Sequence, residues 1–448
     1  MKNSSLPIAV SLGLALLTTV ALAQAPHIDW HAPLISQSAA DAPQVLSADV
    51  VEVSIPAPTN PVVEIAICLD TSGSMDGLIE SAKQKLWAIV NEFVFADPQP
   101  RLRVALYTYG NDGHSPEMGW VKLETPLTED LDLVSMQLFA QSTNGGTELV
   151  GRVVRAATTE LEWSPDPSAL RLIVVAGNET ADQDRAVPFA EACRAAIGRD
   201  IMVNAIYCGP PTHVDCESWR QVARLADGQF ATIDHNNGTV ALATPFDVQL
   251  STLSADLNGT YLAYGTRGEW FGANQVVQDL NAAGQNADSA ASRAFCKANG
   301  LYNNPHWDLV DALKEKKVVL ADVPVEELPE GMRAMTLAQR ESHVALMGEQ
   351  RAKVQARIND LAGQRQLFIE KELKAQQLDD SNSFDGAFRK ALRGQARARG
   401  YRFPAAEPAL EPVVGTMNAG QPEAQGQASP KTEEATPPQS GTKITGEE

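Results

Sequence analysis

A carboxylate and two hydroxyl groups follow directly after an apolar run in the segment Ile65-Ala-Ile-Cys-Leu-Asp70-Thr-Ser72-Gly-Ser74-Met75. The apolar run is typical of a buried strand, which delivers its last residue to the edge of a sheet. The tight Ser-Gly-Ser turn then aims the short side chains of Asp70, Ser72 and Ser74 at one point. Because hard cations such as Mg²⁺ prefer oxygen ligands and retain waters, this spacing predicts a divalent-metal site.

At these residues the chain resembles the von Willebrand factor A family, whose metal-ion-dependent adhesion site carries Asp-x-Ser-x-Ser, then a distant Thr and a distant Asp. The Thr falls in Asn144-Gly-Gly-Thr147-Glu148, where the Gly-Gly pair gives a flexible turn before a helical segment. The fifth position departs from the pattern, since the strand expected at 170–176 is followed by Gly-Asn where most relatives show Asp-Gly. The metal positions that the resemblance implies are Asp70, Ser72, Ser74, Thr147 and Asn178.

The amide of Asn178 supplies an oxygen but no charge, which weakens the attraction of the site for a divalent ion. Glu179 follows it, and we expect its side chain to compensate by reaching in. Two other interpretations stay open. In one, the site has lost its metal, and Ser72 or Ser74 caps the following helix by accepting from backbone N–H groups. In the other, Asp70 is a phosphatase-type nucleophile. Phosphatases of the haloacid dehalogenase kind have Asp-x-Asp at this turn, whereas this chain has Ser72 in place of the second Asp.

In the family, the metal keeps an open position that an acidic residue of the partner completes. The resemblance therefore implies a non-enzymatic protein-binding module, for adhesion or scaffolding, with Mg²⁺, or Ca²⁺ or Mn²⁺, as its ion. The competing function is an enzyme, either a metal-assisted hydrolase or the metal-site subunit of a larger enzyme complex. Against it, His114 and His213 are isolated loop histidines, and the sequence has neither a Gly-x-Ser-x-Gly elbow nor a phosphate loop with Lys.

A polar loop follows the strand expected at 102–109, in the segment Gly110-Asn-Asp-Gly-His114-Ser-Pro-Glu117. Because it leaves the end of a neighbouring parallel strand, we expect its tip to overhang the same edge as the metal turn. His114 and Glu117 would then help to choose the partner. A solvated turn built from ordinary turn residues explains the segment equally well.

Apolar runs alternate with amphipathic helical patterns between residues 61 and 257. Such alternation predicts an α/β fold with a doubly wound, mostly parallel sheet, covered by helices on both faces, of the von Willebrand factor A or Rossmann-like kind. Ligands of such sheets bind at the carboxyl ends of the strands, where the metal turn is expected. The strands that we predict are 62–69, 102–109, 120–123, 170–176, 201–207 and 229–233.

The rest of the chain divides by composition. Residues 1–23 resemble a secretory signal peptide, and residues 24–60 form an Ala-, Pro- and Ser-rich lead-in. An α-helical, coiled-coil-like region is expected over 258–403, including a long charged helix at 336–377, and a disordered tail over 404–448. Because of the signal peptide, and because no later segment has the roughly 20 apolar residues that span a bilayer, we expect a periplasmic or secreted protein without membrane insertion. The chain resembles exported bacterial proteins with a helical C-terminal extension, and self-association through the helical region is one option for its role.

The net charge of −20 disfavours nucleic acid and anionic membranes as partners, because neither polyanion would be attracted. Five cysteines leave at least one unpaired if pairing is intramolecular. Cys208 and Cys216 flank a Gly-Pro-Pro loop and are placed to form a disulfide bond, while Cys193 competes for the same partner. The sequence does not choose among these pairings.

Overall fold

A computed structural model of the chain describes residues 61–232, 242–375 and 384–403. The signal peptide expected at 1–23, the lead-in at 24–60 and the disordered tail at 404–448 lie outside the described residues. Among the described helices, none is both long and apolar enough to cross a bilayer.

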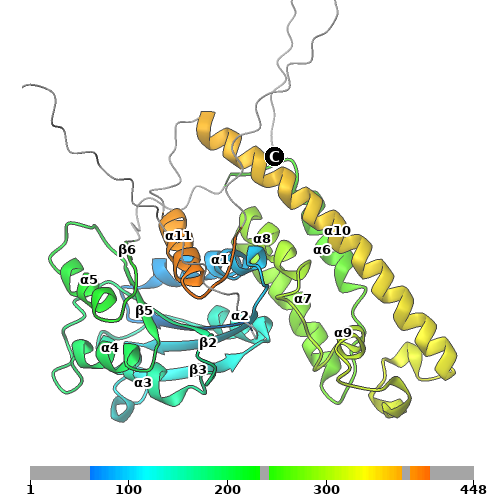
Figure 1. Cartoon of the computed structure of the whole chain (residues 1–448), viewed down its shortest axis with the longest axis horizontal. Coiled ribbons are helices and arrows are strands. Elements are labelled where there is room, and N and C mark those ends of the chain that lie inside the picture. The colour runs from blue at the N-terminus through cyan, green and yellow to red at the C-terminus, as the bar shows by residue number, and fades with distance from the viewer. Residues whose placement is uncertain (1–60, 233–241, 376–383, 404–448) are drawn as a thin grey trace, which may run out of the picture. The chain divides into compact units, whose positions relative to one another are not determined.

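A six-stranded sheet in the order β3-β2-β1-β4-β5-β6 lies at the centre of the first part of the chain (Figure 1). Neighbouring strands are parallel except β2 and β3, which pair antiparallel at one edge. The predicted doubly wound, mostly parallel sheet is therefore confirmed. The strands are β1 Val62–Asp70, β2 Arg101–Tyr109, β3 Val121–Thr128, β4 Leu170–Gly177, β5 Met202–Tyr207 and β6 Phe230–Thr232.

Helices cover both faces of this sheet because the side chains of each strand alternate between them. Ile65 and Leu69 of β1 pack in a core with side chains of α1 and α2, whereas Ala66 and Cys68 pack in a second core with α3, α4 and α5. The helix α1 begins directly after the metal turn. The bounds are α1 Asp76–Asn91, α2 Leu131–Phe139, α3 Val150–Glu160, α4 Phe189–Ile197 and α5 Cys216–Leu225.

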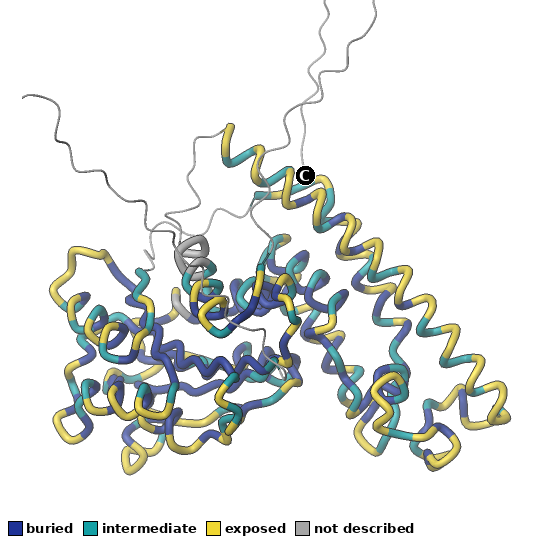
Figure 2. The backbone as a smooth tube through the Cα atoms, in the orientation of Figure 1, coloured by how far each residue is buried: buried dark blue, intermediate teal, exposed yellow. Residues whose placement is uncertain are grey.

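The later helices pack on one another and on α1. The long helix α10 lies against α6, α8 and α9, and its Ile358 and Leu361 share a core with Leu250 and Leu257 of α6. Figure 2 shows α10 exposed along the side away from these helices. The bounds are α6 Asp247–Asn258, α7 Gly268–Gln285, α8 Ala287–Lys297, α9 Leu309–Lys314, α10 Leu337–Ala375 and α11 Phe384–Arg397. Short 3₁₀ helices are η1 Glu92–Phe95, η2 Pro116–Met118, η3 Leu320–Asp322, η4 Val325–Glu327 and η5 Glu330–Met332.

Polar and apolar contacts tie this helical region to the sheet and its covering helices. A buried ion pair joins Arg293 of α8 to Asp132 of α2, and Leu392 of α11 lies in the same core as β1. Tyr401, which follows α11, donates a hydrogen bond to the Val62 carbonyl at 3.3 Å. The predicted division at residue 257 stays a prediction, but the helices after it are packed onto the sheet that precedes it.

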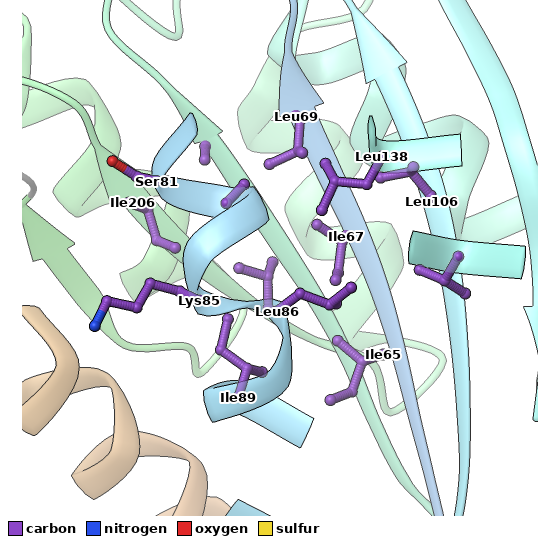
Figure 3. A pocket seen from close by; sticks show the side chains of 14 residues that line it. Ile65, Ile67, Leu69, Ser81, Lys85, Leu86, Ile89, Leu106, Leu138 and Ile206 are labelled. Atoms are coloured by element: carbon purple, nitrogen blue, oxygen red, sulfur yellow. The ribbon is translucent and has the colours of Figure 1, made fainter. Parts of the chain in front are cut away.

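A small apolar cavity of about 50 Å³ lies between α1 and the sheet (Figure 3). Leu86 reaches from α1 toward Ile67 of β1, and the polar lining residues, Ser81 and Lys85, come from α1. An apolar void of this size offers no partners for a polar ligand, so we assign it to imperfect packing of the core.

All five cysteines lie among the described residues, and each is a free, buried thiol. The Cys208–Cys216 bond that the sequence allows is not formed in this structure. Burial raises the pKa of the Cys193 and Cys296 thiols to about 12, as expected of groups that are inert packing residues.

Candidate metal centre

Asp70 is the last residue of β1, and its side chain is completely buried. The backbone N–H of Ser72 donates to Asp70 Oδ1 at 2.8 Å. Two further backbone bonds hold the turn, from Thr71 N to the Tyr109 carbonyl at 2.8 Å and from Gly73 N to the Gly145 carbonyl at 3.0 Å. The turn is therefore fixed between the end of β2 and the loop that carries Thr147.

The other predicted positions come together at the same edge. The hydroxyls of Ser72 and Ser74 lie 3.2 Å apart, and Asn178 Nδ2 donates to Ser74 Oγ at 3.0 Å. Thr147 forms an isolated antiparallel bridge with Gly110, directly after β2. The structure thus brings together all five positions that the sequence singles out, while their role as metal ligands stays a prediction.

The turn does not act as a helix cap. The residue before α1 is Met75, and no side chain makes a capping hydrogen bond to the first turn of this helix. The alternative in which Ser72 or Ser74 survives only to cap α1 therefore has no support in the structure.

A carboxylate that the sequence argument missed, Glu148, lies in the site. Its side chain is only 2% exposed and lies close to Asp70 and Ser72. A Cβ atom at Gly110 would lie 2.7 Å from Asp70 Oδ1 and 3.2 Å from Glu148 Cγ, so the close approach needs a glycine there. The sequence does carry a signal for Glu148, since it is an acidic residue between the predicted ligand Thr147 and the apolar start of a helix.

The two carboxylates leave buried oxygens without partners. Asp70 Oδ2 and Glu148 Oε1 are both inaccessible to solvent and accept no hydrogen bond. Burial raises the pKa of both groups, and the charge of Asp70 raises the pKa of Glu148 further. Unpaired buried oxygens of this kind fit a divalent cation, because carboxylates and hydroxyls are the donor set that such ions take.

No group of three or more His, Cys, Asp and Glu side chains suited to a metal ion occurs among the described residues. The candidate here has two such side chains, Asp70 and Glu148, and a metal would take its remaining ligands from hydroxyls and water. Glu179, which we expected to reach in, is exposed, and its carboxylate accepts from Gln183 Nε2 at 2.9 Å. Its charge nevertheless acts through space and raises the pKa of Asp70.

The predicted partner-binding residues lie in different settings. His114 is half-buried, with Nε2 2.9 Å from Thr108 Oγ1, and burial lowers its pKa. Glu117 is exposed in η2. His213, considered as a base, has Nδ1 2.9 Å from the hydroxyl of Tyr207. Contact of His114 and Glu117 with a partner stays a prediction.

A groove of about 230 Å³ lies beside the turn, between the start of α1 and the segment 141–143. Asp76 and Glu80 of α1 line it, and Thr143 donates a hydrogen bond to Asp76. The cation in the groove, Lys83, is paired with Glu80 at 2.8 Å. The groove that adjoins the candidate site is therefore acidic.

The central strand ends in Asp70-x-Ser72-x-Ser74, the Thr147 loop is bonded to that turn, and the sheet is doubly wound. This is a von Willebrand factor A-type fold. No family model and no curated protein matches the chain.

The von Willebrand factor A-type domain is similar to several solved structures. The conserved hypothetical protein BatB from Bacteroides thetaiotaomicron is 20% identical, with a TM-score of 0.31, over 38% of this chain and 90% of that one. A von Willebrand factor type A protein from Catenulispora acidiphila is 19% identical, with a TM-score of 0.31, over 40% of each chain. Proximal thread matrix protein 1 from the mussel byssus, with a zinc-occupied MIDAS motif, is 14% identical, with a TM-score of 0.32, over 40% of this chain and 43% of that one.

Proposed function

We propose that this protein is a divalent-metal-dependent binding module that captures an acidic residue of a protein partner. The observation that carries the proposal is the buried, unpartnered Oδ2 of Asp70 at the carboxyl end of the central strand. A buried carboxylate oxygen without a donor is costly unless a cation or a proton satisfies it.

Each residue of the site would have a role that follows from its side-chain chemistry. Asp70 would supply negative charge to the ion, while Ser72, Ser74 and Thr147 would supply neutral oxygens. Asn178, hydrogen-bonded to Ser74, would hold that hydroxyl in place or bind a water of the ion. When bound, Mg²⁺, or Ca²⁺ or Mn²⁺, supplies an open coordination position for the carboxylate of the partner.

The charge of the surroundings supports dependence on a metal. Asp76, Glu80 and Glu179 are exposed acidic residues around the turn. Without a cation, these charges would repel the carboxylate of a partner, whereas a bound divalent ion reverses the local field. Binding should therefore require the metal rather than merely improve with it.

We propose a non-enzymatic role because, in the part of the chain that the structure describes, no histidine forms a hydrogen bond or ion pair with Asp70, Ser72 or Ser74. The two loop histidines that the sequence offers as bases, His114 and His213, each have a ring nitrogen hydrogen-bonded to a hydroxyl. Metal-assisted hydrolysis, alone or within a larger enzyme complex, is the competing function. Metal-stimulated turnover that disappears in the Asp70→Ala variant would favour it over binding alone.

Export to the periplasm or out of the cell is part of the proposal and rests on residues 1–23 of the sequence. Self-association through the helical region is a second part, which light scattering of the purified protein measures. Neither part is needed for the metal site to function.

The first experiment is a calorimetric titration of Mn²⁺, Mg²⁺ and Ca²⁺ into the protein and its Asp70→Ala variant. We expect one site per chain in the parent and none in the variant, with Glu117→Ala as a control that binds metal normally. Absence of binding in a folded parent would contradict the proposal.

The second experiment selects displayed peptides on the immobilised protein in Mg²⁺, with elution by EDTA. We expect the selected peptides to share an Asp or Glu whose replacement by Asn or Gln abolishes binding. Peptides that bind equally to the Asp70→Ala protein would show that the metal turn does not receive the partner. His114→Ala and Glu117→Ala then test whether the loop affects the choice of peptide.

A further inference from the structure

We propose that Glu148 is a charged metal ligand of this site, which replaces the carboxylate that the chain lacks at Asn178. This inference rests on the proposed metal-dependent function. It concerns a residue outside the motif Asp70, Ser72, Ser74 and Thr147, and it changes which side chains set the affinity for the ion.

The placement of Glu148 is the first argument. Three side chains surround the point that a Cβ atom at Gly110 would occupy. Asp70 Oδ1 lies 2.7 Å from this point, Glu148 Cγ lies 3.2 Å from it and Ser72 Cβ lies 3.5 Å from it. The charge of Asp70 also acts on Glu148 directly, as two neighbouring carboxylates must. The three side chains thus converge on one small volume beside the end of β2.

The unsatisfied oxygens are the second argument. Asp70 is 0% exposed and Glu148 is 2% exposed, and each has one oxygen without a hydrogen-bond partner. No ion pair formed by the described residues includes either carboxylate. Two buried carboxylates side by side repel each other, so either a proton or a cation must supply positive charge between them. A divalent cation that touches both Oδ2 and Oε1 would provide it.

The third argument is that neither Asn178 nor Glu179 places a carboxylate beside Asp70. Asn178 faces Ser74 as an uncharged amide, and Glu179 is exposed and bonded to Gln183. Glu148 is therefore the carboxylate in contact with Asp70. With it the site has two negative charges, the number that Asp70 and an acidic fifth position would give, and charge count is a main determinant of affinity for hard cations.

Backbone contacts hold Glu148 in place beside Asp70. Thr147, next to Glu148, is bridged to Gly110, and Gly73 N bonds to the Gly145 carbonyl. The position of Glu148 relative to Asp70 is thus set by backbone contacts between three segments. A ligand fixed in this way contributes its full charge without a large cost in ordering.

The test is a calorimetric titration of Mn²⁺ into the full chain and its Glu148→Gln variant, with Glu179→Gln as the matched control. We expect Glu148→Gln to weaken Mn²⁺ binding by about tenfold or more, and Glu179→Gln to change it by less than about threefold. Thermal melts without metal separate a ligand from a structural residue. The glutamine amide can donate to Asp70, so metal-free Glu148→Gln should melt no lower than the parent, while its stabilisation by Mn²⁺ is lost.

A rescue variant gives a second measurement. Adding Asn178→Asp to Glu148→Gln returns the second charge at the fifth position of the motif, and we expect it to restore most of the lost Mn²⁺ affinity. Affinity unchanged by Glu148→Gln but abolished by Asp70→Ala would overturn this inference and leave the proposed function standing. A lower melting temperature without metal, with no rescue by Asn178→Asp, would make Glu148 structural and also overturn it. A folded parent that binds no Mn²⁺ would remove both proposals.

Discussion

At the level of single residues, burial of charge governs the candidate site. Asp70 and Glu148 are buried, so their ionised forms depend on the donors or cations that the protein places near them. Ser72 N donates to one oxygen of Asp70, but Oδ2 has no donor. The chemistry of the site is therefore that of an incompletely satisfied anion, which the proposed cation would satisfy.

His114 should titrate below the ordinary value for histidine. Burial lowers its pKa, and because the Thr108 hydroxyl donates to Glu124, His114 Nε2 is the donor in the bond to Thr108. Between the folded and unfolded pKa values the unfolded chain binds a proton that the native state does not. The stability contributed by neutral His114 is thus complete above about pH 6.5 and declines as the pH falls.

Nuclear magnetic resonance titration of the imidazole checks this shift, and Glu117→Ala serves as a control because Glu117 is exposed in the same loop. A His114 pKa at or above 6.5 in the parent would contradict the buried placement. The same result would also mean that His114 can carry a positive charge in contact with a partner near neutral pH.

At the level of elements, polar side chains hold the helical region on the sheet. Arg293 of α8 pairs with Asp132 of α2 and also with Asp279 of α7 at 2.9 Å. Gln278 of α7 accepts from Ser135 of α2 at 2.9 Å. The faces of α7 and α8 that meet α2 thus form an interface whose buried polar groups bond to one another.

Removing one charge from this interface should be costly. Asp132→Asn leaves the buried Arg293 with one carboxylate fewer, and we expect a loss of about 3 kcal/mol in the free energy of unfolding. Urea unfolding measures it. Glu129→Gln is the control, because the Arg101–Glu129 pair is exposed and should contribute less than about 1 kcal/mol. Equal effects of the two substitutions would show that the buried pair is not essential to docking.

The packing of α1 on the sheet gives a second prediction at this scale. Leu86 is 2% exposed and lines the cavity above β1, so Leu86→Ala enlarges an existing void. We expect a loss of about 3 to 5 kcal/mol in urea unfolding. Leu280→Ala, at a side chain that is 66% exposed, should cost less than about 0.5 kcal/mol. A small effect at Leu86 would mean that α1 collapses onto the sheet and closes the void.

At the level of the whole molecule, the chain after α10 returns to the sheet. Leu392, Ala396 and Tyr401 are buried in the same core as β1. Arg393 of α11 pairs with Glu92 of η1 at 2.7 Å, and Gln395 Nε2 donates to Asn204 Oδ1 of β5 at 2.8 Å. Residues beyond 257 thus complete the core that the sheet begins.

Truncation tests this dependence. A chain that ends at residue 375 loses the side chains of α11 and Tyr401 from the core, and we expect it to lose at least about 3 kcal/mol of stability and to melt at a lower temperature. A chain that ends at residue 403 keeps α11 and should melt like the full protein. Equal melting temperatures for the two truncations would mean that the sheet domain is stable without α11.

The sequence by itself determined the features that depend on neighbouring residues. The apolar run that ends at Asp70 specifies β1 and its edge, and the alternation of runs specifies a doubly wound sheet, because burial on both faces and strand periodicity are local patterns. The Asp70, Ser72 and Ser74 turn was predictable for the same reason.

Only the tertiary structure decided which charges surround Asp70. Glu148 is next to Asp70 because the β2 end, the Thr147 loop and the metal turn pack together, while Glu179 is turned toward Gln183. The return of α11 to the sheet is likewise absent from any local pattern. Contacts between segments distant in the chain depend on how whole elements pack, and the polar or apolar pattern within one segment does not encode them.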